Sequence, residues 1–228
     1  MATLLKGGTV ISSRGETPAD VRLENGLVSA VGADLPAGGA QVVDCAGMLL
    51  FPGFIDGHTH FDLEVGGTIT ADDFASGSRA ALRGGTTMVV DFAAPDKGES
   101  LSSGLARWRA KAAGRAACDY GFHMTIDDWN EEISREIGEM MDQGISSFKM
   151  YMTYPAMMLP EGDMYRALLR LKEAGGIAGV HCENDGVIRA LTEEARAAGR
   201  LSPASHPRTR PAPLEAEAVG HLLRLAQL

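Results

Sequence analysis

Two histidines separated by one residue, His58 and His60, are the first residues whose types and spacing suggest catalysis. They follow an apolar run that begins after Pro52-Gly53, as expected of a strand. Because residues two apart on a strand face the same side, Asp56, His58 and His60 would project together. Two imidazoles on one face can bind a borderline-soft metal such as zinc. The alternative is a pair of loop histidines that bind no metal.

A third histidine, His181 in GIAGVHCEND, also ends an apolar run. A single histidine in such a position is more often a satisfied core residue than a ligand. Strand ends converge in a (β/α) barrel, however, and active sites form at the carboxyl ends of its strands. Two histidine-bearing strand ends therefore favour one shared site.

Lys149 in GISSFKMYMTY suggests a different chemistry. It shares one strand face with Ser147, while the bulkier Phe148 and Met150 lie on the other face, which should meet helices. Lys149 would then point into a barrel, where burial of an unpaired ammonium lowers its pKa. A neutral amine can add carbon dioxide to become a carbamate, an anion whose two oxygens can bridge two metals. The alternative is a lysine whose ammonium reaches solvent at the strand end.

Asp91 ends a further apolar run, TTMVVDFA. Its carboxylate could accept a hydrogen bond from a metal-ligating histidine and so orient that ring. It could equally cap the loop that follows. His123, on another run, is interpreted as a core residue or as a residue that supports the site.

The segments that must position these residues alternate between strand-like and helix-like patterns after Phe51. Strands are predicted at 54–57, 86–92, 120–125, 146–150 and 177–181, and helices at 71–83, 100–113, 130–143, 163–174, 185–199 and 214–228. Residues 202–213 are predicted to form a proline-rich loop. This alternation indicates an α/β fold with a parallel sheet. Five such units favour part of a (β/α) TIM barrel, which has eight strands when complete.

Residues 1–50 show a different pattern, typical of a small β domain. The runs 20–24 and 27–31 alternate on either side of Asn25-Gly26, a dipeptide that strongly favours a hairpin turn. The predicted division is therefore a β domain at 1–50 followed by the first part of the barrel at 51–228.

Composition excludes several classes of function. The chain has 228 residues with 21 basic and 30 acidic side chains, and its net charge of −9 disfavours nucleic-acid and anionic-membrane partners. No apolar run approaches the roughly 18 residues of a membrane-spanning helix, and no signal peptide is visible. Three widely spaced cysteines argue against a disulfide framework and favour a cytoplasmic location.

Taken together, the motifs resemble the dihydropyrimidinase and hydantoinase group of the cyclic amidohydrolases. The similarity runs in order through PGFIDGHTHFD, GGTITADDFASGSRAALRGGTTMVVDFA, SSFKMYMTY and GVHCEND, and it covers essentially the whole chain. The H-x-H pair is shared by the wider superfamily. The succession GGT, DDF and GGTT, with a tyrosine five residues after the lysine, is much more specific.

The resemblance implies a centre of two divalent metal ions, most often zinc. His58 and His60 would be ligands of the first ion, His181 would be a ligand of the second, and Lys149 would be the carboxylated lysine that bridges both. Tyr154 would hydrogen-bond the developing oxyanion.

Three further residues would shape the pocket for the exocyclic substituent of the substrate ring, namely Leu63, Tyr151 and Met158. The resemblance also implies that residues 1–50 belong to a β-sandwich and that the enzyme is a homo-oligomer, a tetramer in this family.

The implied activity is zinc-dependent hydrolysis of the cyclic amide of a dihydropyrimidine or a 5-substituted hydantoin, which yields an N-carbamoyl amino acid. Two metals would activate a hydroxide at neutral pH as the nucleophile. A further zinc-binding histidine and the catalytic aspartate of the family would lie beyond Leu228. Residues 1–228 are therefore expected to be the N-terminal part of such an enzyme and to be inactive alone.

Three alternatives stay open. An allantoinase or dihydroorotase would usually carry an arginine soon after the H-x-H pair, and FDLEVGGT has none. A non-catalytic, dihydropyrimidinase-related interaction protein would have lost metal ligands, whereas His58, His60, Lys149 and His181 are all present. The third alternative is an inert, partly folded fragment.

Overall fold

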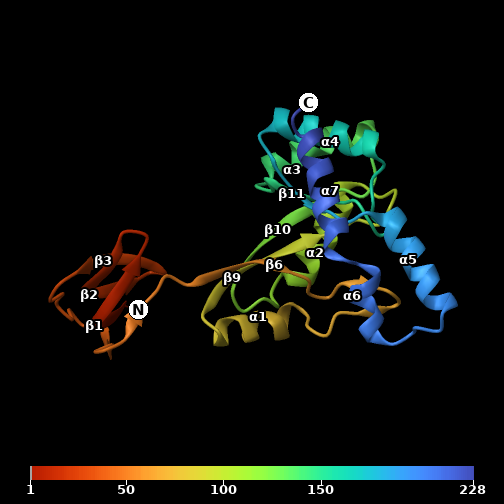
Figure 1. Ribbon diagram of the computed structural model, residues 1–228. Helices are drawn as coiled ribbons and strands as arrows, with labels where there is room; N and C mark the ends of the chain where they lie inside the picture. The colour runs from red at the N-terminus through yellow and green to blue at the C-terminus, as the bar shows by residue number, and fades with distance from the viewer. Residues whose placement is uncertain (1) are drawn as a thin grey trace. The chain divides into compact units, whose positions relative to one another are not determined.

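The computed structural model describes residues 2–228 and separates them into two compact units. The first runs to Phe54 and includes Gly85–Thr87, and the second comprises Ile55–Gly84 and Met88–Leu228. Each unit is built around its own five-stranded sheet. Figure 1 shows the chain coloured from its N-terminus to its C-terminus.

The first unit consists mainly of hairpin-connected strands. Strands β1 (Ala2–Ser12), β2 (Gly15–Glu24) and β3 (Leu27–Gly32) pair antiparallel in sequence order, and the short β4 (Gln41–Asp44) and β5 (Leu49–Leu50) pair parallel to β1. Asn25 and Gly26 join β2 to β3 with φ values of 53° and 78°, the two successive left-handed residues that a tight hairpin turn requires. The hairpin predicted at this dipeptide is confirmed.

The second sheet has the strand order β12-β11-β10-β9-β6, and its strands curl into part of a barrel (Figure 1). The strands are β6 (Phe54–Thr59), β9 (Thr86–Ala93), β10 (Asp119–Thr125), β11 (Ser147–Tyr151) and β12 (Ile177–His181). Neighbouring strands from β9 to β12 pair in parallel. All five predicted strands are confirmed, as is the α/β class with part of a TIM barrel.

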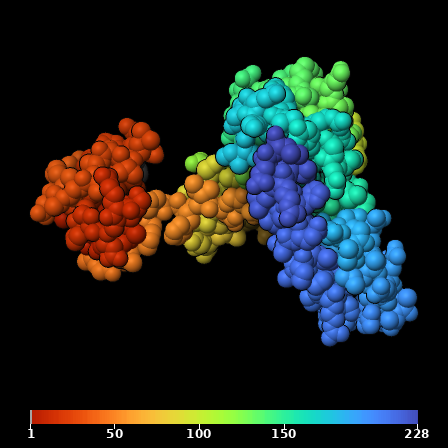
Figure 2. Space-filling view, turned by 45° about the horizontal axis from the view of Figure 1, so that its top comes forward, coloured from red at the N-terminus to blue at the C-terminus, as the bar shows by residue number. Residues whose placement is uncertain are grey.

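Helices alternate with these strands close to the predicted ranges. They are α1 (Phe74–Arg83), α2 (Leu101–Ala112), α3 (Glu131–Asp142), α4 (Glu161–Ala174), α5 (Asp185–Ala197) and α7 (Ala212–Leu225). Helix α1 begins later than predicted because Asp73 is its N-cap, and the carboxylate of Asp73 accepts hydrogen bonds from the backbone N–H groups of Ala75 and Ser76. Figure 2 shows α7 on the outer surface of this unit, beside α5.

Two connections differ from the prediction. Residues 202–213 were predicted to be a loop, but they contain a 3₁₀ turn (Pro203–Ser205) and a short helix α6 (His206–Thr209). Proline is compatible with both because it occupies the first positions, where its missing N–H costs no hydrogen bond. A short hairpin of β7 (Glu64–Val65) and β8 (Thr68–Ile69), which no pattern indicated, follows the H-x-H pair.

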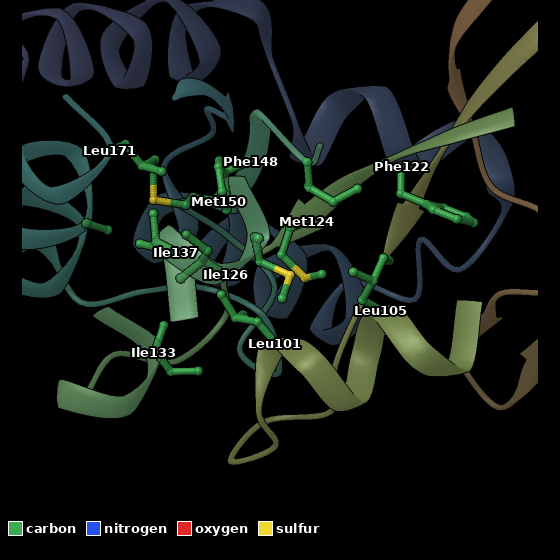
Figure 3. Packing of buried hydrophobic residues seen from close by; sticks show 14 of the residues in the cluster. Leu101, Leu105, Phe122, Met124, Ile126, Ile133, Ile137, Phe148, Met150 and Leu171 are labelled. Carbon is green, nitrogen blue, oxygen red and sulfur yellow. The ribbon is translucent and has the colours of Figure 1, made fainter. Parts of the chain in front are cut away.

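The apolar core of the second unit lies between the sheet and helices α2, α3 and α4 (Figure 3). Phe148 and Met150 of β11 are 1% and 0% exposed and pack there, near Ile137 of α3 and Leu171 of α4. The prediction that this strand turns its bulky side chains toward helices is confirmed. None of the helices formed by residues 2–228 has the length and apolar character needed to cross a bilayer.

Candidate metal centre

His58 and His60 converge at the carboxyl end of β6. Their Nε2 atoms lie 3.2 Å apart, and both rings rest on the ring of Phe92, at centroid distances of 4.6 and 4.8 Å. Two nitrogens bound to one tetrahedral zinc at ~2.1 Å would be separated by roughly 3.4 Å. The two imidazoles therefore fit a single metal ion, as the alternation of the strand predicted.

The surroundings keep these two imidazoles neutral. Burial lowers the pKa of His60, and the neighbouring His58 lowers it further. The pKa of His58 is also lowered, first by desolvation and then by the positive charge of Lys149. A neutral imidazole has the free lone pair that a metal ligand needs. The Nδ1 atom of His60 is buried and has no hydrogen-bond partner in the described chain.

Asp91 supports the backbone on either side of His60. Its Oδ2 atom accepts hydrogen bonds from the hydroxyl of Thr59 at 2.9 Å and from the N–H of Phe61 at 2.8 Å. Its Oδ1 atom accepts from the indole N–H of Trp108 on α2 at 3.0 Å. Acceptance from a histidine ring, one of the two alternatives for Asp91, is not seen among the described residues, because the backbone and hydroxyl donors of the neighbouring strand end occupy the carboxylate.

Lys149 lies between two groups of aromatic rings. Its Nζ atom is 5.8 Å from the ring centre of Phe92, on which His58 and His60 rest, and 5.2 Å from that of Tyr151. Desolvation lowers the pKa of Lys149. The residues paired with it in the sheet are Thr125 and Gly179. Gly179 adds no side chain beside the amine, and the buried Thr125 hydroxyl has no partner within residues 2–228.

His181, at the end of β12, lies beside the aromatic rings of Tyr151 and Tyr154. Its ring is 6.1 Å from that of Tyr151 and 5.1 Å from that of Tyr154, measured between centroids. Tyr151 is the residue paired with His181 in the parallel register. Lys149 therefore lies between the Phe92 ring, on which the H-x-H pair rests, and the Tyr151 ring, which is next to His181.

Glu183 is a site residue that the sequence analysis missed. Its Oε2 atom lies 2.7 Å from Nε2 of His181. A ring that donates a proton from Nε2 to this carboxylate keeps the lone pair of Nδ1 free for a metal. The sequence spacing could have indicated this residue. Glu183 stands two residues after His181 in an extended segment, so the two side chains can face the same side.

Tyr154 has an unusual backbone conformation. Its φ is 69°, which is costly for a residue with a side chain, and the residue is 39% exposed. Its carbonyl accepts hydrogen bonds from the N–H groups of Met157 and Met158, at 2.7 and 2.9 Å. These two bonds hold the strained turn and present the phenol beside His181.

The three residues assigned to the substituent pocket are not all brought together. Leu63 lines a cavity of about 460 Å³ between the β7–β8 hairpin and the ends of β9 and β10. Met158 lines a separate cavity of about 340 Å³ beside α4, α5 and α7. Tyr151 is buried, with a pKa raised to about 12, mainly by desolvation.

His123 supports the centre, in line with its interpretation as a core or supporting residue. Its Nε2 atom lies 2.9 Å from the carbonyl oxygen of Gly57, next to His58, and its Nδ1 atom lies 2.6 Å from the hydroxyl of Ser147. No group of three or more His, Cys, Asp or Glu side chains that could hold a metal ion occurs among residues 2–228.

Comparison with known proteins identifies relatives over the whole chain. The model of the amidohydrolase family matches residues 49–208. A D-hydantoinase of Streptomyces coelicolor is 44% identical over 232 residues, covering 99% of this chain and 50% of the relative. A dihydropyrimidinase of Rattus norvegicus is 40% identical over 230 residues, covering 98% of this chain and 44% of the relative.

Solved structures show the same likeness. The crystal structure of a dihydropyrimidinase from Brevibacillus agri matches with a TM-score of 0.97 at 41% identity, covering 100% of this chain and 50% of that one. The chain thus spans about half the length of the relatives it matches.

Proposed function

The chain belongs to the amidohydrolase family, and we propose that it is part of a zinc-dependent cyclic amidase that opens dihydropyrimidines or 5-substituted hydantoins to N-carbamoyl amino acids. The observation that carries the proposal is the convergence of the Nε2 atoms of His58 and His60 to 3.2 Å, with Lys149 beside them. The names of the relatives, D-hydantoinase and dihydropyrimidinase, support the class of substrate.

In this proposal His58, His60, Lys149 and His181 hold two divalent ions. When bound, the ions would polarise the amide carbonyl and make water nucleophilic at neutral pH. The role of the chain is to supply the imidazoles and to orient them. Asp91 holds the backbone around His60, and Glu183 holds the ring of His181.

Lys149 would act as a carbamate. Its depressed pKa raises the fraction of neutral amine. The amine nitrogen attacks the carbon of carbon dioxide, and loss of one proton leaves an anion with two oxygens. The ammonium of Lys149 is a cation that repels metal ions. The carbamate is an anion, and its two oxygens would be able to bind two metal ions. The absence of a side chain on Gly179, the sheet neighbour of Lys149, leaves one flank of the amine open.

Tyr154 would donate a hydrogen bond from its phenol to the oxygen of the amide carbonyl as negative charge develops there. Its position beside His181 supports this role. Leu63, Tyr151 and Met158 would contact the ring substituent, Leu63 from the larger of the two cavities described above. A cytoplasmic homotetramer is proposed on family resemblance alone.

The test combines elemental analysis with ring opening. The full-length protein, of which residues 1–228 are expected to be one part, should carry about two divalent ions per subunit when it is expressed in zinc-supplemented medium, by the two-metal logic. It should open dihydrouracil and hydantoin, with faster turnover than on allantoin or dihydroorotate. Absence of stoichiometric metal would contradict the proposal, and preference for allantoin would reassign the substrate.

A further inference from the structure

Asp127 is a buried carboxylate to which no side chain within residues 2–228 donates a hydrogen bond. It follows β10 closely and is 6% exposed. Asp91, which is also buried, accepts from a hydroxyl, an indole and two backbone N–H groups. The carboxylate oxygens of Asp127 are not sealed inside the protein without a partner, so a ligand in the cavity that Asp127 lines can supply a hydrogen-bond donor.

The carboxylate of Asp127 lines the cavity of about 460 Å³ that also contains Leu63. Desolvation raises the pKa of Asp127 to about 6, while its own backbone N–H and the charge of Lys97 oppose the rise. At neutral pH the group is therefore mostly ionised, and an ionised carboxylate in a protected cavity is a strong hydrogen-bond acceptor.

Two of the three cations that line the same cavity are engaged elsewhere. Arg107 forms ion pairs with Asp96 and Glu99. Lys111 donates to the carbonyl of Asp62 and lies over the ring of Trp108. Lys97 is exposed, and its ammonium lies 3.5 Å from the carbonyl oxygen of Met158. Positive and negative groups balance around the cavity, so a neutral donor suits Asp127 better than a second cation would.

The segment that carries Asp127 is bonded to the strand that carries Lys149. The residue before Asp127, Ile126, donates its N–H to the carbonyl of Lys149 at 2.8 Å. The charge of Asp127 also contributes to the raised pKa of Tyr151, whose ring lies beside the Lys149 amine. The apolar part of the wall comes from Leu63, Trp108 and neighbouring residues.

We propose that Asp127 is a specificity-determining residue, and that the cavity receives a ring substituent with an apolar arm that ends in a neutral hydrogen-bond donor, such as a hydroxyl. This inference rests on the proposed function for the identity of the ring. The apolar wall would contact the arm, and Asp127 would accept the terminal hydrogen bond. A substituent of equal length ending in methyl would leave the carboxylate buried without a partner, which sites of this kind discriminate against strongly.

The test is direct binding, measured by calorimetry on the full-length protein after metal removal, so that the probes bind without being opened. The probes are 5-(ω-hydroxybutyl)hydantoin and 5-pentylhydantoin, together with pairs that have shorter and longer arms. Within each pair the arms have equal length, and one ends in a hydroxyl where the other ends in a methyl. For the best-fitting pair the hydroxyl compound should bind about 10- to 100-fold more tightly, as expected of hydrogen bonds to a charged group. Asp127→Leu should abolish this preference.

Two variants make the result specific. Asp142→Asn removes an exposed carboxylate on α3, outside the cavity, and should leave the preference unchanged. Asp127→Asn keeps a neutral acceptor of the same shape, so it should lower the preference for the hydroxyl probe about 10-fold. This variant provides a readout if Asp127→Leu does not fold. Equal affinities for every pair, or a wild-type preference in either Asp127 variant, would overturn the assignment.

Ring opening of unsubstituted hydantoin and dihydrouracil is measured in parallel. If neither ring is opened while the binding preference depends on Asp127, the proposed function fails and the role of Asp127 in binding stands. If both rings are opened and the preference is absent, the role of Asp127 fails and the proposed function stands.

Discussion

The indole N–H of Trp108 donates a 3.0 Å hydrogen bond to Oδ1 of Asp91, and this contact ties helix α2 to the strand end that carries the H-x-H pair. The other oxygen of Asp91 accepts from Thr59 and Phe61, the residues on either side of His60. The angle at which His60 faces His58 therefore depends on a carboxylate and a helix outside the metal ligand set.

Asp91→Asn should consequently weaken metal binding. An asparagine has one acceptor oxygen, so it cannot serve both Trp108 and the donors of the strand end. Loss of such supporting contacts typically lowers metal affinity about 10- to 100-fold. The measurement is a zinc competition titration, with Asp96→Asn as the surface control and circular dichroism to confirm folding. A folded Asp91→Asn protein with wild-type zinc affinity would refute this role.

Lys149→Arg should abolish ring opening although it preserves the positive charge. A guanidinium stays protonated and cannot form the proposed carbamate. Metal content should fall with activity, and Lys149→Ala should regain some activity when short-chain carboxylic acids supply bridging oxygens. Wild-type turnover in Lys149→Arg would remove the carbamate from the mechanism.

Tyr154→Phe should reduce turnover while leaving the metal content unchanged. Loss of one oxyanion donor typically costs about 100- to 1,000-fold in kcat. Phenylalanine keeps the ring beside His181, so the comparison isolates the phenol. Steady-state kinetics on dihydrouracil, combined with elemental analysis, test this prediction. An unchanged kcat would exclude Tyr154 as the donor.

Glu183→Leu should weaken the metal site that contains His181. The variant removes the carboxylate 2.7 Å from Nε2, so the ring loses its orientation and its preferred tautomer. A decrease of about 10- to 100-fold in zinc affinity is expected, with partial recovery in Glu183→Gln, which retains an acceptor. If Glu183→Leu and wild type bind zinc equally, the carboxylate does not position His181.

The raised pKa of Asp127 predicts that the difference in unfolding free energy between wild type and Asp127→Asn depends on pH. Its pKa is about 6 in the folded protein against 3.8 for an aspartate in the unfolded chain, so folding favours the protonated form. The stabilisation is complete below the unfolded pKa and is lost as pH rises through the folded pKa. Relative to Asp127→Asn, wild type should lose about 3 kcal/mol of unfolding free energy between acidic and neutral pH, by the usual conversion of a pKa difference. Urea unfolding of both metal-free proteins at several pH values measures this change. A pH-independent difference would contradict the raised pKa.

Local patterns predicted most of the fold. The alternation around Lys149 placed Phe148 and Met150 against the helices because the strand period leaves only two choices. The hairpin at Asn25-Gly26 followed from the left-handed conformations that these two residues accept. Both features depend on interactions between residues close in sequence or on one strand.

Long-range partners were harder to predict. The direction of the Asp91 carboxylate depends on Trp108 and Thr59, which reach it from different elements. The cavity that contains Asp127 is likewise formed by residues from helix α2 and from several separate segments. No periodicity within one segment reports such contacts, because they depend on how elements pack. Glu183 is different, since its spacing from His181 did carry a usable signal.

The parallel register of the second sheet also governs the order of events during folding. Each pair from β9 to β12 is separated by a helical crossover, so the chain must close a loop before either strand gains its partner. Proteins rich in such non-local pairings fold more slowly than those built from local contacts. The H-x-H pair and Lys149 meet only after the strands between them have assembled. Metal capture by these residues would therefore be a late step that locks an assembled sheet, and not the event that nucleates it.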